Sequence, residues 1–252
     1  MIELKNIAGG YRNITVIQNI SMQFMPNALN IVIGPNGCGK STLMRIAAGL
    51  LAPHSGEVLL SGESFSSISR KGLAGRIAYL PQSRNIPDIP VETLVLHGRF
   101  PHLAYPRRYR KEDIILARQA MAQMGIEELA DKRMNTLSGG ERQKVYIAMM
   151  LAQNGDVMFL DEPATYLDIR RQLEVMDILL SLKKAGKTLV VILHDLNLAM
   201  RYADRIFVMK DGSLLYEGST GNLFESQLLK DVFGVEAGRT DTGKTGIQYY
   251  FT

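Results

Sequence analysis

Two kinds of apolar pattern occur along the chain. Near its start, apolar and polar residues alternate at 2–7 and at 20–24, which predicts two antiparallel strands at the edge of a sheet. Continuous apolar runs at 31–33, 157–160 and 188–193 are instead typical of strands buried on both faces of a parallel sheet. The pattern therefore predicts an antiparallel segment followed by strands of the buried, parallel type.

Stretches with helical spacing separate these runs, and the alternation of strands with helices predicts an α/β fold. Helices are predicted at 40–50, 114–124, 138–152, 169–185 and 226–233. Further strands are predicted at 58–60, 77–80, 205–210, 213–217 and 247–251, with Asp211-Gly212 as the turn of a hairpin. In the helix at 169–185, the predicted apolar face consists of Ile169, Leu173, Met176 and Leu180.

The character of the chain changes between Ser83 and about Thr136. Four prolines interrupt the first part, which predicts loops, and the helical pattern at 114–124 follows, so we interpret this stretch as an inserted helical lobe. The lobe contains a basic cluster interleaved with tyrosines: Arg99, Tyr105, Arg107, Arg108, Tyr109, Arg110 and Lys111. A solvated or partner-facing loop is favoured over an RNA contact, because no basic excess along the chain supports RNA binding. His97 and His102 are predicted to be ordinary loop histidines.

Length and composition limit the classes of protein. A chain of 252 residues is long enough for one large α/β domain, or for a domain with an inserted lobe. Its net charge of +4 does not indicate a nucleic-acid binder, and its pI of about 9.1 fits an anionic ligand or a membrane-adjacent surface equally well. The single cysteine, Cys38, indicates a reducing compartment. Without a signal sequence or an apolar run of about 18 residues, we expect a soluble protein that reaches a membrane only through a partner.

Gly34 to Ser41 fits the phosphate-binding pattern G-x-x-x-x-G-K-[ST]. Glycines let backbone N–H groups converge on phosphates, Lys40 is suited to reach the β- and γ-phosphates, and Ser41 is suited to bind Mg²⁺. A glycine-rich turn ahead of a helix is the plain alternative. The apolar strand before the motif and the apolar-periodic helix after it favour the nucleotide site.

The apolar strand at 157–160 is followed by Asp161 and Glu162. Two carboxylates at a buried strand end are costly unless they meet a cation or a reacting water. Asp161 is suited to hold Mg²⁺ through water, and Glu162 to polarise an attacking water. A cap for the next helix explains one of the two acids but not both.

Three further residues are candidates for the same site. Gln82 follows a strand and is suited to ligate Mg²⁺ or position water, although surface glutamines are common. His194 follows the strand at 188–193, and we predict a γ-phosphate contact for it. Tyr11 is suited to stack on adenine. An ordinary half-buried tyrosine of a strand is an equally good interpretation.

Ser138, followed by Gly139 and Gly140, is a good N-cap for the helix after it, and this helix N-terminus is a second candidate for anion binding. One nucleotide needs only one such terminus for its phosphates. The second terminus therefore suggests a site completed elsewhere, on another subunit.

Taken together, these motifs resemble the nucleotide-binding subunit of an ABC transporter, over residues 2 to 235. Gly34–Thr42 resembles the Walker A loop, Gln82 the Q-loop, Leu137–Glu141 the signature, Val157–Glu162 the Walker B strand, Tyr166-Leu167-Asp168 the D-loop and His194 the switch histidine. The resemblance implies nucleotide contacts from Tyr11, Gly34, Pro35, Asn36, Gly37, Cys38, Gly39, Lys40, Ser41, Thr42, Ser138, Gly139, Gly140, Glu141 and Asp168. It implies catalytic roles for Gln82, Glu162 and His194, and Mg²⁺ ligation by Ser41, Gln82 and Asp161.

The stretches 98–102, 161–169 and 194–199 look most like the ATPases that serve iron-siderophore, haem and vitamin B12 import, although zinc and manganese importers have similar subunits. Glu141 stands where the family usually has glutamine, and Ala164 where a hydroxyl residue is common. Neither change removes a group that contacts phosphate or metal in the family. ATP hydrolysis is therefore still expected.

For fold and partners, the resemblance implies a P-loop NTPase core with a mixed, mainly parallel sheet, an N-terminal antiparallel β subdomain and an inserted helical subdomain. Core and β subdomain are expected at about 1–82 and 157–235, the helical signature subdomain at about 83–156 and a C-terminal extension at about 236–252. Two copies are expected to enclose two ATP molecules with Mg²⁺. Permease subunits, whose coupling helix would dock after Gln82, are expected to hold the pair at the cytoplasmic face of the cell membrane, with a substrate-binding protein as indirect partner and no nucleic acid.

Two other functions remain open. A soluble ABC protein acting on DNA or ribosomes usually shows a coiled-coil insertion or tandem cassettes, and the chain has neither. A small-molecule kinase would leave Leu137–Glu141 without a role. The sequence does not identify the cargo.

Overall fold

The computed structural model describes residues 1–82, 85–165, 167–241 and 247–252. Its chain divides into two compact units, one made of Met1–Ile68 with Leu182–Thr252 and the other of Ser69–Ser181. Tyr166, which the sequence assigns to the D-loop, lies outside the described residues. The fold class is α/β, with parallel strand pairs and an N-terminal antiparallel sheet, as predicted.

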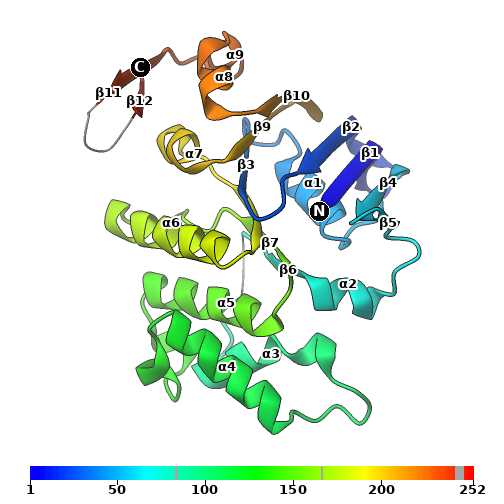
Figure 1. Cartoon of the computed structure of the whole chain (residues 1–252), viewed down its shortest axis with the longest axis vertical. Helices are drawn as coiled ribbons and strands as arrows, with labels where there is room; N and C mark the ends of the chain where they lie inside the picture. The colour runs from blue at the N-terminus through cyan, green and yellow to red at the C-terminus, as the bar shows by residue number, and fades with distance from the viewer. Residues whose placement is uncertain (83–84, 166, 242–246) are drawn as a thin grey trace. The chain divides into compact units, whose positions relative to one another are not determined.

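The first unit contains most of the strands (Figure 1). Its strands are β1 (Ile2–Tyr11), β2 (Ile14–Phe24), β3 (Leu29–Ile33), β4 (Ser55–Leu60), β5 (Glu63–Ser64), β8 (Thr188–Ile192), β9 (Arg205–Lys210), β10 (Ser213–Gly218), β11 (Ala237–Asp241) and β12 (Ile247–Phe251). Its helices are α1 (Lys40–Ala47), α7 (Leu196–Tyr202), α8 (Thr220–Glu225) and α9 (Leu228–Phe233).

The antiparallel sheet of this unit has the strand order β2-β1-β4-β5, so the predicted antiparallel pairing of the first two strands is confirmed, although only β2 lies at the edge and β1 also pairs with β4. The alternation that predicts these strands also places their apolar side chains on one face. Phe24 at the end of β2 is fully buried and packs edge-on against Phe207 of β9, with ring centroids 5.3 Å apart. Aromatic pairs in this geometry stabilise a core beyond their buried area.

The parallel strands of the unit surround β3, which pairs with β8 on one side and with β9 on the other. Every residue of β3 and β8 is buried, which explains their continuous apolar sequences. The β9–β10 hairpin turns at Asp211 and Gly212, with φ angles of 47° and 78°. Positive φ at both positions is what a two-residue hairpin turn requires, so this prediction is confirmed.

The second unit is mainly helical and contains one parallel strand pair (Figure 1). Its elements are α2 (Arg70–Arg76), β6 (Ile77–Leu80), α3 (Val91–His97), α4 (Lys111–Gln123), α5 (Gly139–Gln153), β7 (Val157–Asp161), the start of α6 (Ile169–Lys184), and the 3-10 helices η1 (Phe100–His102), η2 (Glu127–Leu129) and η3 (Met134–Thr136). Helices α3, α4 and α5 pack against one another.

Four of the described α-helices, α2, α3, α7 and α8, are absent from the sequence predictions. α3 lies in the segment predicted to be loops, so His97 and His102 end α3 and η1 rather than lying in a loop. α2 and α8 are short, and the side chains of Ser69 and Ser219 cap them. Serine caps of this kind are a usable signal for a helix start. Pro90 stands just before α3, where its missing N–H breaks no helical hydrogen bond, so this proline precedes a helix and does not indicate a loop.

Two predicted helix faces need correction. α1 ends at Ala47 rather than Leu50, because Gly49 has a φ of 73°, and Leu50 is 61% exposed. In α6, Ile169 is 77% exposed. The buried residues of α6 are Val175, Met176, Leu179 and Leu182. The buried face is displaced around the helix by about one residue from the predicted face. α6 carries two overlapping apolar faces, and the spacing of its apolar residues does not show which of them is buried.

Arg99 does not belong to the solvated basic cluster. It is only 8% exposed, and its Nε lies 3.0 Å from Oδ1 of Asp113 while Nη1 donates to the carbonyl of Ala152. Burial alone would raise the pKa of Asp113, but hydrogen bonds from the Arg110 N–H and from Arg99 outweigh it and lower that pKa. Arg99 therefore joins α4, through its ion pair with Asp113, to the end of α5, through its hydrogen bond to the carbonyl of Ala152.

Replacing Arg99 with Met is expected to lower the free energy of unfolding by about 3 kcal/mol, because a buried carboxylate loses its cation. Urea unfolding followed by circular dichroism measures this change. Arg118 is the matched control, since its pair with Glu92 leaves the arginine side chain 70% exposed. Arg118→Met is expected to cost less than about 1 kcal/mol, and equal losses in the two variants would contradict a special role for the buried pair.

No helix in the described ranges combines the length and apolarity that crossing a bilayer requires.

Candidate functional site

The phosphate loop lies in the first unit, between β3 and α1. Gly37 and Gly39 have φ angles of 78° and 101°, a region that favours glycine, and a Cβ at Gly39 would approach Cγ2 of Ile17. Gly39 also precedes α1 and has no side chain with which to cap it. The first N–H groups of α1 therefore face the loop, which is the arrangement that binds phosphate at a helix N-terminus.

Lys40 is the first residue of α1 and is only 6% exposed. Its ammonium donates to the carbonyl oxygens of Gly34 at 2.8 Å and Pro35 at 2.9 Å. A buried ammonium held by neutral carbonyls leaves a net positive charge inside the loop. This charge fits an anionic group such as a phosphate.

Cys38 is buried in the same loop at 5% exposure. Burial raises the pKa of its thiol above the usual range, so little of it is thiolate at neutral pH. We expect a maleimide to react with Cys38 at least about tenfold more slowly than with a free thiol at pH 7, and faster as the pH rises.

Modification of Cys38 is expected to abolish ATP binding, and ATP to protect the thiol from modification. Mass spectrometry of the adduct, combined with binding of a fluorescent ATP analogue, tests both points. Normal ATP binding by fully modified protein would contradict the placement of Cys38 beside the nucleotide.

His194 and the phosphate loop emerge from neighbouring strands. β3 and β8 run parallel with Val32 opposite Ile192, so Gly34 and His194 each follow two residues after that pair. His194 is exposed, and Asp195 caps α7 by accepting from the backbone of Asn197 and Leu198. The structure thus brings His194 to the same sheet edge as the loop, while its γ-phosphate contact stays a prediction.

Tyr11 ends β1 with its side chain partly in solvent, the residue being 41% exposed. Nη1 of Arg45 donates to its hydroxyl at 2.7 Å, and the guanidinium carbon lies 5.9 Å from the ring centroid. An exposed ring held in place by an arginine is suited to stack on a base. Arg45 escapes sequence analysis because only the fold brings α1 beside β1.

The acidic strand end lies in the second unit. Asp161 ends β7 at 1% exposure, and Tyr79 of β6 donates to its Oδ2 at 3.2 Å. Glu162 follows at 9% exposure with a φ of 52°, a left-handed conformation that is strained for a residue with a side chain. Strain of this kind is typical of functional positions.

The side chains of Gln82 and Thr165 both donate to the carboxylate of Glu162. Nε2 of Gln82 donates to its Oε2 at 2.5 Å, and Oγ1 of Thr165 donates to the same oxygen at 3.2 Å. β6 and β7 pair in parallel with Leu80 opposite Leu160, so Gln82 and Glu162 leave the sheet side by side. The structure therefore unites these two predicted residues and adds Tyr79 and Thr165, which the sequence offered no signal to find.

The predicted cap at Ser138 is confirmed. Its hydroxyl accepts from the N–H of Glu141, and the carboxylate of Glu141 accepts from the N–H of Ser138. These hydrogen bonds lower the pKa of Glu141. Glutamate at this position therefore completes a capping box, which explains how the chain accommodates its departure from the usual glutamine. On the helix that follows, Val145, Ala148 and Ala152 are buried and Met149 is half-buried.

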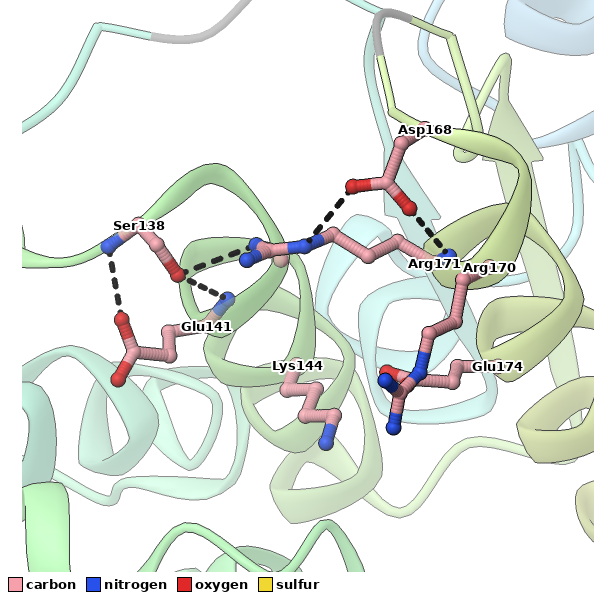
Figure 2. Close-up of a pocket in the computed structure, with 8 residues that line it drawn as sticks. Ser138, Glu141, Lys144, Asp168, Arg170, Arg171 and Glu174 are labelled. Atoms are coloured by element: carbon pink, nitrogen blue, oxygen red, sulfur yellow. Dashed lines mark hydrogen bonds and ion pairs between the residues drawn. The ribbon is translucent and has the colours of Figure 1, made fainter.

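A pocket of about 530 Å³ lies beside this cap (Figure 2). It is lined by Ser138, Gly140, Glu141, Lys144, Asp168, Arg170, Arg171 and Glu174. Asp168 accepts from the backbone N–H of Arg171 and forms an ion pair with its side chain. The second unit thus joins the predicted Ser138 and Asp168 at one pocket.

The predicted residues divide between the two units. Tyr11, the loop 34–42 and His194 belong to the first, whereas Gln82, Asp161, Glu162, the segment 138–141 and Asp168 belong to the second. Among the residues that the structure describes, no group of three or more His, Cys, Asp or Glu side chains is arranged to hold a metal ion. Nε2 of His102 lies 2.7 Å from the carbonyl oxygen of Gln153.

The chain is similar to ABC transporter proteins in both sequence and structure. A model of the ABC transporter family matches residues 17–165. The chain is 41% identical over 228 residues to the ferric enterobactin transport ATP-binding protein FepC of Escherichia coli, covering 90% of this chain and 84% of that protein. It is 38% identical over 237 residues to the petrobactin import ATP-binding protein FpuD of Bacillus anthracis, covering 93% and 87%. A metal-chelate type ABC transporter, solved in an inward-facing conformation, matches with a TM-score of 0.86 at 25% identity, covering 100% of this chain and 96% of that one.

Proposed function

The chain belongs to the ABC transporter family, and from this premise we propose that it is the ATP-hydrolysing subunit of an importer for a metal chelate of the iron-siderophore, haem or cobalamin type. The observation that carries the proposal is the similarity, over nine tenths of the chain, to ATP-binding subunits named for ferric enterobactin and petrobactin. The phosphate loop and the acidic strand end supply the groups that ATP hydrolysis requires.

The first unit fits ATP. The glycines of the loop leave its backbone accessible, and the buried ammonium of Lys40 supplies the charge that a triphosphate needs. We assign phosphate contacts to residues 34–42, a γ-phosphate contact to His194 and base stacking to Tyr11. Tyr11 is supported in this role by the arginine that holds its hydroxyl.

The oxygen donors of Ser41, Gln82 and Asp161 fit Mg²⁺, which prefers one or two carboxylates together with substrate phosphates to an all-protein cage. When bound, the ion would neutralise charge on the transferred phosphoryl group.

Glu162 is assigned as the base that takes a proton from the attacking water. The hydrogen bonds from Gln82 and Thr165 to Oε2 orient its carboxylate for this role. Gln82 is thereby a positioning residue for Glu162 in addition to its assignment at Mg²⁺. Because Gln82 precedes the segment expected to dock the permease, it is suited to couple docking to hydrolysis.

We assign Ser138 to Glu141 and Asp168 to the ATP held by a second copy of the chain. The cap at Ser138 is a second helix N-terminus suited to anions, and the first copy already supplies one such terminus from α1. Two copies are therefore proposed to enclose two ATP molecules. We further propose a subdomain division into core and β residues at about 1–82 and 157–235, signature residues at about 83–156, and an extension from 236.

Permease subunits and, indirectly, a substrate-binding protein are the proposed partners, with the chain at the cytoplasmic face of the cell membrane. An affinity-tagged chain purified from detergent-treated membranes is expected to bring an integral membrane protein with it at a ratio of two chains to two permease subunits or one fused permease. Purification of the chain without a membrane protein would favour a soluble ABC protein instead.

A further inference from the structure

Arg171, on the first turn of α6, links two segments of the second unit that are far apart in the sequence. Its Nη1 donates to Oγ of Ser138 at 3.2 Å, and its Nε lies 3.2 Å from Oδ2 of Asp168. Its backbone N–H also donates to Oδ1 of Asp168 at 3.0 Å. Figure 2 shows the guanidinium extending from α6 to the start of α5, between the two residues that it joins.

The contact determines what the hydroxyl of Ser138 can do. A serine hydroxyl accepts at two lone pairs and donates one hydrogen. The N–H of Glu141 and Nη1 of Arg171 both donate to Oγ of Ser138, at 3.4 and 3.2 Å. Both lone pairs are therefore engaged, and the hydroxyl hydrogen is left to point toward a third group. A positive charge on one of the two donors also makes the hydroxyl a stronger donor toward an anion.

Gly140 permits this arrangement. A Cβ built at Gly140 would lie 2.5 Å from Nη1 and 3.1 Å from Cδ of Arg171, so the arginine packs directly on the glycine. Any side chain at position 140 would displace the guanidinium. The need for glycine here thus has a local cause besides access to a phosphate.

A contribution to the free energy of unfolding does not explain why Arg171 joins Ser138 to Asp168. The side chains of Arg171 and Asp168 are 41% and 63% exposed, and surface ion pairs of this kind contribute little to the free energy of unfolding. The neighbouring Arg170 makes a comparable exposed pair with Glu174 but has no contact with Ser138 among the interactions described. Arg171 is distinguished from it by joining Ser138 to Asp168.

We propose that Arg171 is a positioning residue of the two-chain ATP site: it holds Ser138 and Asp168 together and directs the hydroxyl hydrogen of Ser138 toward the phosphate bound by the other chain. The proposal rests on the proposed function, since it requires that the signature of one copy meets the ATP of the second. Arg171 itself need not touch the phosphate.

The test uses the full chain in a Glu162→Gln background, in which ATP is bound but not consumed. Light scattering and sedimentation over a range of protein concentrations give the dissociation constant of the ATP-dependent dimer. Arg171→Ala is expected to weaken each of two equivalent interfaces about tenfold, and hence the dimer about 100-fold. Arg118→Ala, the matched control, is expected to change it less than about threefold, because Arg118 forms an exposed pair with Glu92 away from the pocket at Ser138.

Two further measurements separate positioning from charge or folding. ATP binding by the single subunit, measured below the dimerisation range, is expected to stay within about twofold in Arg171→Ala, because that step uses the phosphate loop. Arg171→Lys keeps the charge but lacks the planar fork that contacts two partners at once, so it is expected to remain impaired. Full rescue by lysine, or equal effects of the two alanine variants, would overturn the positioning role. A parent that forms no dimer with ATP would overturn the proposed function, and the role of Arg171 with it.

Discussion

Replacing Glu162 with Gln is expected to lower steady-state ATP hydrolysis by about 10³-fold while ATP binding persists. The amide has almost the shape of the carboxylate but cannot accept a proton from water at neutral pH. Gln82 and Thr165 can still donate to the remaining side-chain oxygen, so the local hydrogen bonds survive the change. The loss is therefore expected in the chemical step rather than in folding or binding.

Phosphate release measures the rate of the Glu162→Gln variant, and light scattering in the presence of ATP measures its state of association. A stable dimer is expected, because hydrolysis no longer separates the two copies. Glu174→Gln serves as the control, since Glu174 is an exposed partner of Arg170. A monomer in ATP would count against the enclosure of ATP between two copies, and near-normal hydrolysis would exclude Glu162 as the base.

Lys40→Ala is expected to weaken ATP binding at least about 100-fold, because charge-assisted hydrogen bonds to phosphate are lost. The ammonium also holds the carbonyls of Gly34 and Pro35, so its removal frees the loop from its present conformation. Binding of a fluorescent ATP analogue, with unlabelled ATP as competitor, measures the change.

Lys5→Ala is the matched control for Lys40. Lys5 lies in the same unit, its side chain is 48% exposed, and it pairs only loosely with Glu3 at 3.8 Å. We expect ATP affinity in Lys5→Ala to match the parent. Undiminished ATP binding by a folded Lys40→Ala variant would remove the basis for placing the triphosphate in the loop.

The sequence predicts those parts of the fold in which local pattern and tertiary burial agree. Buried strands such as β3 and β8 have apolar residues at every position, and the Asp211-Gly212 turn requires backbone angles that these residues favour. The motifs also identify the family, which the comparisons confirm. For these strands and this turn, the residues nearby in the sequence are sufficient to predict the local structure.

Other features depend on the arrangement of distant segments. Which of two apolar faces of α6 is buried depends on its neighbours, so the exposure of Ile169 does not follow from its spacing. Arg99 looks like one of several loop arginines until the fold places Asp113 3.0 Å away. Arg171 resembles any charged residue of an exposed helix turn, and only the packing of α6 beside α5 brings it to Ser138. No local pattern encodes such pairs.

The structure also refines which groups act together. Sequence motifs name Gln82 and Glu162 as separate elements, 80 positions apart, whereas the structure joins them by a hydrogen bond of 2.5 Å. Likewise, the signature and the segment containing Asp168 become one pocket through Arg171. The candidate site thus contains pairs of motifs that the fold brings together.

Cargo-stimulated hydrolysis tests the assignment most directly. The chain would be purified with its membrane partner, placed in lipid vesicles and supplied with the substrate-binding protein. The rate of ATP hydrolysis would then be compared with ferric siderophore, haem, cobalamin, and free manganese or zinc ions as cargo. We expect one class of metal chelate to raise the rate, and the stimulation to vanish in Glu162→Gln. Stimulation by a free metal ion with no response to any chelate would contradict the assignment as a metal-chelate importer.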